Sequence, residues 1–291
     1  SLVTGSMVML AVSAWHLRRQ SSVEAFRRTA AVSLVILVPA TVLILIVGSE
    51  LGVIETKYQP MKIAAAEAQW SNCQPCSFSL FQVGGGTQDK TPTKIIQIPH
   101  LLSLLATNSW NGGVTGLTQL NAQYQQQYGP GNYVPNVFVQ YWSMRVMAYL
   151  ATVVFVLALW GAWVMWRGKV EHARWFLFAA TWAVITPFFM NTAGWMLTEN
   201  GRQPWIVQGL MKTSNGVSPS VDSTSIWISL ILFVAMYGVL AAIDGVLMVR
   251  YARKGLGAEE EHGGDGSAPG PSGAGAGDMT SEADRVPALT Y

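Results

Sequence analysis

Residues 137–166 read VFVQYWSMRVMAYLATVVFVLALWGAWVMW, an apolar run in which Arg145 is the single charged residue. A helix that spans a membrane needs about 20 predominantly apolar residues, so this run is long enough to cross one. Three further runs of this kind cover residues 29–50, 173–198 and 223–250. The sequence therefore predicts an all-α fold, a polytopic bundle of transmembrane helices.

The composition agrees with a chain that lies largely in a membrane. Charged residues make up 12% of the 291 residues and hydrophobic residues 51%, whereas a typical soluble domain is about 25% charged. A shorter apolar run, residues 2–17, opens the chain without a preceding basic segment. We interpret it as the remaining part of a spanning helix rather than a signal peptide. We expect the sequence to be part of a longer protein.

Basic residues gather in alternate short connections between the apolar runs, which predicts that these connections face the cytoplasm. They are Arg18, Arg19, Arg27, Arg28, Arg167, Lys169, Arg174, Arg250, Arg253 and Lys254. The net charge is only +2, and no basic stripe suggests a nucleic-acid partner.

The chain divides into four segments on this topology. Residues 1–53 hold two membrane helices, the first one truncated, and residues 54–136 form a long extracytoplasmic loop. Residues 137–254 hold three more membrane helices. Residues 255–291 are rich in Gly, Ala, Ser, Pro and acid, a composition that cannot bury enough apolar surface to fold. We expect this tail to be disordered and cytoplasmic.

Arg145 and Met147 lie about 15 Å inside the membrane if their helix begins near Asn136. A buried arginine needs a partner such as a haem propionate or a quinone oxygen. A thioether is a known axial haem ligand, although a membrane methionine more often serves packing alone. Asp244, near the cytoplasmic end of the last run, is interpreted as a structural residue that its neighbours cap or pair.

Trp195, Glu199 and Arg202 follow one another at spacings i, i+4 and i+7, so they share a face if the helix continues through them. Pro204 prevents regular helix far beyond Gln203. Two interpretations stay open. The first is an interface belt with a Glu199–Arg202 ion pair, and the second is a buried carboxylate beside a charged cofactor.

Lys62 and Glu67 lie five residues apart in a helix-prone part of the outer loop, about 140° around a helix. At that angle they would flank a ligand. Together they could hydrogen-bond the oxygens of a lipid-soluble dihydroxy aromatic and accept its proton. The alternative is a solvated amphipathic helix that rests on the bilayer.

Cys73 and Cys76 fall outside the membrane, where an oxidising compartment favours a disulfide; two free thiols are the alternative, and a redox-active dithiol is disfavoured. The histidines His16, His100 and His172 fall at helix ends or in loops, and a fourth falls in the tail. Any haem would therefore take Met or Glu from this chain and histidine from elsewhere.

Four motifs in this order carry a resemblance to a known family. They are QPMKIAAAEAQW (59–70), IIQIPHLLSLLA (95–106), WSMRVM (142–147) and AGWMLTENGRQPW (193–205). They resemble subunit I of the cytochrome bd quinol oxidases, and the likeness extends from Ser1 to about Gly255. It implies that the chain corresponds to the last five of nine transmembrane helices.

The resemblance also implies roles for single residues. Met147 matches the second axial ligand of a six-coordinate b haem, and Arg145 matches an arginine that supports this haem electrostatically. Lys62 and Glu67 match the quinol-binding pair of the outer loop, which the family calls the Q-loop.

The motif near the second haem site is matched as well. Glu199 matches a carboxylate associated with the second b haem, beside haem d, and is a tentative iron ligand. Trp195 matches a tryptophan between the haems, and Arg202 an arginine on the propionate side. Glu199 and Trp195 are thus the expected catalytic residues.

The function that the resemblance implies is that of the haem- and quinol-binding subunit of a bd-type terminal oxidase in the bacterial cytoplasmic membrane. Quinol would be oxidised at the outer face, and electrons would pass through two b haems to haem d, where oxygen is reduced to water. A second homologous membrane subunit and accessory subunits would be its partners. The alternative is a non-redox helical transporter or structural subunit, in which Arg145 and Glu199 bind an ion or pair with each other.

Overall fold

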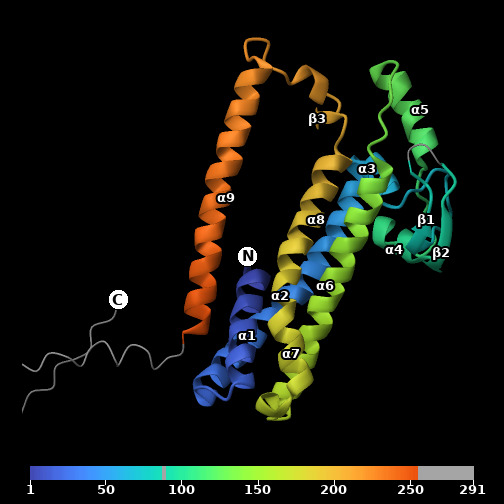
Figure 1. Cartoon of the computed structure of the whole chain (residues 1–291). Helices are drawn as coiled ribbons and strands as arrows, with labels where there is room; N and C mark the ends of the chain where they lie inside the picture. The colour runs from blue at the N-terminus through green and yellow to red at the C-terminus, as the bar shows by residue number, and fades with distance from the viewer. Residues whose placement is uncertain (87–89, 255–291) are drawn as a thin grey trace, which may run out of the picture. The chain divides into compact units, whose positions relative to one another are not determined.

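The computed structural model describes residues 1–86 and 90–254. It contains four helical segments long and apolar enough to cross a membrane. They are α2 (Val23–Tyr58), α6 (Val137–Trp166), the segment Arg174–Gly201 and α9 (Ser223–Arg253). A fifth and shorter helix, α1 (Leu2–Arg18), precedes them (Figure 1). The predicted polytopic helical fold is confirmed, whereas the prediction of a disordered tail lies outside the described residues.

The helices pack around an apolar core between α1, α2, α6 and α7 (Arg174–Trp182). Leu10, Leu37 and Phe176 are among the buried members of this core. Gly161 lets α6 approach its neighbours closely, because a Cβ atom there would lie 2.6 Å from Leu34 Cδ2. α6 also packs along α8 (Thr186–Gly201), which places residues 137–147 beside residues 193–201.

The third predicted run is helical but not one regular helix. A 3-10 turn, η2 (Ala183–Ile185), separates α7 from α8. Pro187 lies in the first turn of α8, a position where its missing N–H leaves no hydrogen bond unmade. α8 ends at Gly201 with Arg202 as its C-cap, so the GRQPW motif begins at a helix end.

The outer loop holds more regular structure than the sequence predicts. It contains three helices, α3 (Pro60–Ala66), α4 (Leu101–Thr107) and α5 (Leu117–Tyr128), and an antiparallel pair, β1 (Phe78–Val83) and β2 (Thr93–Ile98). In this pair Phe78 lies opposite Ile98. The smaller elements of the chain are η1 (Val170–His172), β3 (Trp205–Val207), β4 (Met211–Lys212) and η3 (Thr213–Asn215).

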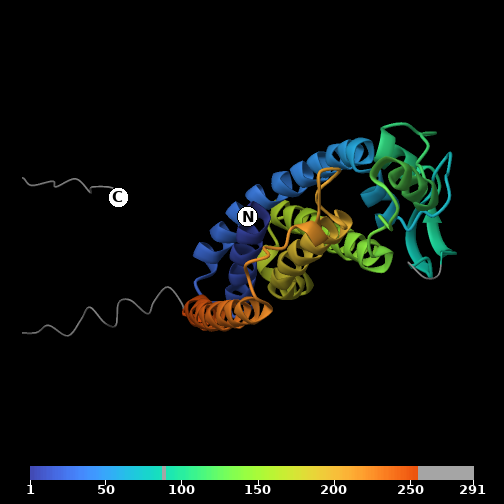
Figure 2. The ribbon, with the colours of Figure 1, turned by 90° about the horizontal axis from the view of Figure 1, so that it is seen from above.

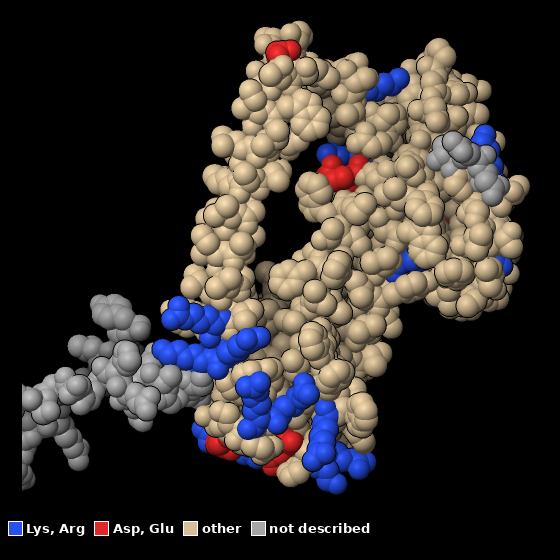
Figure 3. Space-filling model, viewed as in Figure 1, with Lys and Arg blue, Asp and Glu red and all other residues tan. Residues whose placement is uncertain are grey.

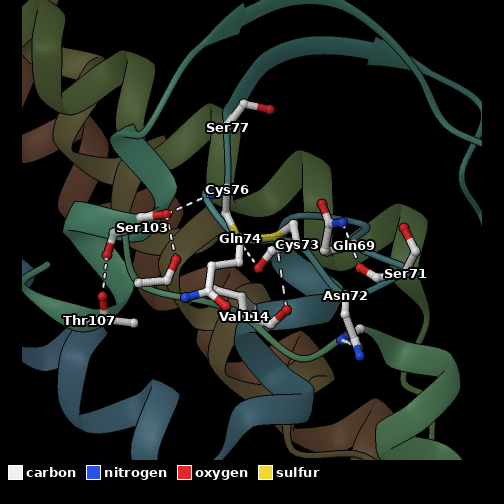
Figure 4. The surroundings of a disulfide bond; sticks show 12 residues. Gln69, Ser71, Asn72, Cys73, Gln74, Cys76, Ser77, Ser103, Thr107 and Val114 are labelled. Atoms are coloured by element: carbon white, nitrogen blue, oxygen red, sulfur yellow. Dashed lines mark hydrogen bonds between the residues drawn. A yellow bond between two sulfur atoms is a disulfide. The ribbon is translucent and has the colours of Figure 1, made fainter. Parts of the chain in front are cut away.

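A disulfide joins Cys73 and Cys76 at the base of β1 (Figure 4). The Cys76 backbone N–H donates to Ser103 Oγ at 2.7 Å, and Ser103 Oγ donates to the Gly112 carbonyl at 2.7 Å. Cys73 exchanges backbone hydrogen bonds with Val114. These hydrogen bonds hold the disulfide-closed turn against α4 and the segment around Val114. The disulfide confirms the prediction of a structural pair.

α9 stands apart from the core, since none of its residues is buried. Figure 2 shows it nearly end-on. One contact at its C-terminal end joins His16 Nε2 and the Ala252 carbonyl at 2.9 Å. The expectation that neighbours cap or pair Asp244 is wrong for the described chain, in which this side chain forms no hydrogen bond or ion pair. The cause is local, because the residues one turn away, Leu240 and Met248, are apolar.

Candidate functional site

The centre of the site is a fully buried ion pair between α6 and the outer loop. Arg145 Nη1 donates to Glu67 Oε1 at 2.9 Å, and Nη2 donates to Oε2 at 2.8 Å. The other guanidinium donors reach backbone carbonyls, with Nε at 2.9 Å from Ser79 O and Nη1 at 3.0 Å from Ala66 O, while Nη2 also contacts Ser79 O. All the donors of the guanidinium are thus engaged. The partner of Arg145 in the described chain is the loop carboxylate.

Aromatic rings complete the surroundings of Arg145. Its guanidinium carbon lies 4.1 Å from the centre of the Tyr141 ring and 4.5 Å from that of Phe78. Such rings exclude water while they still stabilise a cation. A charge pair in this dry setting is held firmly, because either partner alone would be left unneutralised in a low-dielectric environment.

Lys94 on β2 is a further charged residue near Glu67 and Arg145. It was not predicted at this site from the sequence. Its ammonium donates to Gln69 Oε1 at 3.0 Å. Burial lowers the pKa of Lys94, and the Glu67 carboxylate opposes this decrease in part. The sequence does contain a signal for this residue, because Lys94 lies among the β-branched residues of Thr93–Ile98. That signal is informative only if a strand is predicted there.

Lys62 lies on α3 and is only 6% exposed, while Glu67 caps the same helix and is 2% exposed. The alternative of a solvated surface helix is therefore wrong. The Lys62 ammonium forms an ion pair with Glu55 near the end of α2 and not with Glu67. Glu55 was missed because its approach to Lys62 depends on the turn at Gln59 that ends α2.

The C-terminal end of α8 packs closely against Lys62 of α3 and Gln140 of α6. A Cβ atom on Gly201 would lie 2.4 Å from Gln140 Nε2 and 2.6 Å from Lys62 Cγ. Asn200 Nδ2 donates to Gln140 Oε1 at 3.0 Å. The Gln140 amide nitrogen is buried and has no acceptor among the described residues. Gln140 was also missed, because a single amide in an apolar run gives no signal of its surroundings.

Met147 faces the other side of α6. It lies two residues after Arg145, or about 200° around the helix, and its Sδ is 3.2 Å from where a Cβ atom on Gly194 would lie. The thioether is half-buried against α8 and receives no hydrogen bond from the described chain. Its soft donor atom fits a haem iron. Within the described ranges no three His, Cys, Asp or Glu residues gather as a metal site.

Glu199 and Arg202 form an ion pair at the end of α8, and both side chains are partly exposed. Trp195, one turn earlier, is 71% exposed. This pair is the contact that the interface-belt interpretation predicts, whereas the predicted buried carboxylate is not found in the described chain, because the Glu199 side chain is partly exposed. A direct Arg145–Glu199 pair, which the transporter alternative allowed, is wrong because Arg145 is bound to Glu67.

The chain was compared with known proteins. Residues 1–256 match the family model described as cytochrome bd terminal oxidase subunit I. A relative from Bacillus subtilis (strain 168), cytochrome bd ubiquinol oxidase subunit 1, is 34% identical over 90% of this chain and 56% of its own length. Cytochrome bd-II ubiquinol oxidase subunit 1 from Escherichia coli (strain K12) is 28% identical over 87% and 60%, respectively.

A solved structure gives the same result. The bd oxidase from Geobacillus thermodenitrificans superposes with a TM-score of 0.71 at 27% identity, over 85% of this chain and 54% of the matched one. The chain thus spans little more than half the length of these relatives. Since the family model covers nearly all of its described residues, the chain belongs to the cytochrome bd terminal oxidase subunit I family.

Proposed function

We propose that this chain is part of the haem- and quinol-binding subunit of a bd-type oxidase, which oxidises a membrane quinol and reduces oxygen to water. The observation that carries the proposal is the seating of α3 on α6 and α8, with Lys62 and Glu67 both buried and each held by its own partner. Burial and ion pairing restrict the motion of these two side chains, so the loop holds their charged groups at fixed positions.

For quinol, we assign binding to Lys62 and Glu67. A small apolar hollow of about 50 Å³ touches Glu67 and is lined by Thr56, Phe78 and Met144, among others. We expect an aromatic head group to approach the Glu67 carboxylate from this apolar side. Glu67 would accept a quinol proton, while Arg145 holds the carboxylate in place by two hydrogen bonds. Lys62 would donate a hydrogen bond to the second quinol oxygen.

For the cofactors, the proposal follows the same residues. When bound, two b haems and a haem d supply the one-electron and oxygen chemistry. Met147 would offer its thioether, which lies beside Gly194, to a haem iron. Arg145 would support this haem electrostatically from the same helix, with its charge shared by the Glu67 carboxylate. Arg202 orients the Glu199 carboxylate, which would hold a proton for oxygen reduction. Trp195, whose indole is exposed in the described chain, would lie between the haems.

For the cellular setting, we propose the bacterial cytoplasmic membrane with a cytoplasmic C-terminus. Figure 3 shows that basic side chains gather at one end of the molecule, as the positive-inside rule requires of the cytoplasmic end. The exposed apolar surface of α9 offers an area for a second homologous membrane subunit, and accessory subunits would join that assembly.

The test uses the purified membrane complex that contains this chain. Met147→Leu keeps the volume and the apolar character but removes the sulfur, so the reduced-minus-oxidised spectrum should lose a low-spin six-coordinate b haem. Met144→Leu, the same change three residues earlier on α6, is the matched control and should leave the spectrum intact. An unaltered spectrum in Met147→Leu would exclude the ligand assignment. A wild-type complex without haem absorption or quinol-driven oxygen uptake would instead favour the transporter alternative.

A further inference from the structure

A second pocket lies at the opposite end of the bundle, where α6 ends and α7 begins. Its volume is about 460 Å³, and its lining includes Trp163, Arg167, Lys169, Arg174 and Trp175. None of these residues takes part in the quinol or haem sites. The pocket thus combines three cationic side chains with indole rings in one concave surface.

No carboxylate within residues 1–86 and 90–254 neutralises the cations in this pocket. Lys169 and Arg174 form no side-chain hydrogen bond or ion pair with those residues. The Arg167 guanidinium lies over the Trp163 ring, 4.8 Å from its centre, and meets no carboxylate of the same described ranges. The adjacent acid, Glu171, is 3.8 Å from the His172 ring rather than from a lysine or an arginine. The pocket therefore presents excess positive charge.

The first turns of α2 show that unpaired cations are not required by membrane topology alone. They carry Arg27 and Arg28 and lie at the basic end of the molecule (Figures 1 and 3). Both arginines bind the Glu24 carboxylate, at 2.8 Å and 2.9 Å. Arg27 and Arg28 are thus neutralised by a neighbouring acid, whereas the three cations of the pocket have no such acid among the described residues.

The walls of the pocket indicate which anion. Phe176 and Val164 are buried at its floor, while Trp163 and Trp175 are exposed. Exposed tryptophans at the end of a spanning helix mark the head-group level of a bilayer. Basic pockets between membrane helices on the cytoplasmic side bind anionic lipid head groups, and a guanidinium matches phosphate oxygens in geometry.

We propose that this pocket binds the phosphate-bearing head group of an anionic phospholipid, with Lys169 and Arg174 on the phosphate and the indole rings along the adjoining acyl chain. The assignment does not depend on the proposed oxidase function. It uses the charge, shape and aromatic lining of this end of the bundle, together with the cytoplasmic orientation that the basic residues predict.

The test is a native mass spectrometry titration of the delipidated complex. Cardiolipin and phosphatidylglycerol should bind at least tenfold more tightly than phosphatidylcholine. The double variant Lys169→Gln/Arg174→Gln should lose about 25-fold in cardiolipin affinity, since each basic residue near an anionic surface contributes a factor of roughly five. Arg27→Gln/Arg28→Gln, which removes the same charge from the start of α2, should change that affinity less than threefold.

Three results would overturn the proposal. The first is equal binding of phosphatidylcholine. The second is binding of inorganic phosphate with no preference for anionic lipid, which would assign the pocket to a free anion. The third is a double variant that keeps its lipid but loses another subunit, which would assign the surface to a protein. Haem spectra of both double variants check that the complex remains assembled.

Discussion

Glu67→Gln tests whether the buried ion pair holds the outer loop on the membrane helices. The substitution keeps the size of the side chain but replaces one carboxylate oxygen by an amide nitrogen. That nitrogen would face Arg145 Nη2, which now donates to Glu67 Oε2 at 2.8 Å. Two donors would then oppose each other, and the arginine would stay buried without a counter-charge.

The magnitude follows from the burial of the pair. Removal of one partner of a buried ion pair costs about 3–5 kcal/mol. The remaining amide oxygen can still accept from Nη1, so we expect the lower value, about 3 kcal/mol, for the local opening of the loop. At 1.36 kcal/mol per factor of ten, amide hydrogen exchange in β1 should become about 150-fold faster if exchange follows local opening.

The assay is hydrogen exchange followed by mass spectrometry on the purified complex, with peptides that cover Phe78–Val83. Glu24→Gln is the control, because it also removes one carboxylate that binds arginine but does so at an exposed site. Such exposed pairs contribute about 0–1 kcal/mol, so β1 should exchange as in the wild type. An increase below tenfold for Glu67→Gln would refute the view that this pair anchors the loop.

The same variant distinguishes a defect in the outer loop from a defect on the haem side of α6. Quinol-driven oxygen uptake should fall strongly, because the proposed proton acceptor is lost and its surroundings are loosened. Uptake from an artificial donor that bypasses the loop should persist, since Met147 lies on the far side of α6 against Gly194. Equal losses with both donors would place the defect at the haems instead.

Three further predictions concern the neighbouring contacts. Gly201→Ala should destabilise the complex by about 1–3 kcal/mol through overpacking, measured as a lower thermal midpoint, because its Cβ would lie 2.4 Å from Gln140 Nε2; Gly238→Ala, with nothing within 4 Å, should not. Lys62→Met should raise the KM for quinol more than it changes oxygen uptake from the artificial donor, and the reverse pattern would contradict a quinol contact. Glu199→Ala should alter the high-spin b haem and haem d signals while the low-spin b haem persists; wild-type haem content together with wild-type oxygen uptake would argue against a cofactor role.

The membrane architecture could be predicted from the sequence, because long apolar runs have few other stable solutions. The expected start of α6 near Asn136 and the positions of the other spans agree with the structure to within a few residues in most cases. α2 is the exception, since it extends to Tyr58, eight residues beyond the apolar run that ended the prediction at residue 50. Charged residues such as Glu55 can continue a helix beyond the membrane, where hydropathy gives no signal.

The contacts of the candidate site could not be predicted in the same way. Arg145 was recognised as a buried charge in need of a partner, yet its partner lies 78 positions away in the loop. Spacing along one helix predicts pairs such as Glu199 and Arg202, which the structure contains. Helix spacing does not predict contacts that form only when distant segments fold together. Examples are the contacts of Lys62 with Glu55 and of Lys94 with Gln69.

The attachment of Arg145 to the loop backbone limits how the protein can be re-engineered. Its guanidinium binds the carbonyl groups of Ala66 and Ser79 as well as the Glu67 side chain. The loop and α6 therefore form one structural unit. A chimaera that receives the quinol loop of a relative would need a backbone that returns to the same two carbonyl positions. Transplanting residues 59–83 by sequence alignment alone would risk leaving a bare cation inside the membrane protein. The exchangeable unit is the loop together with the helix on which it rests.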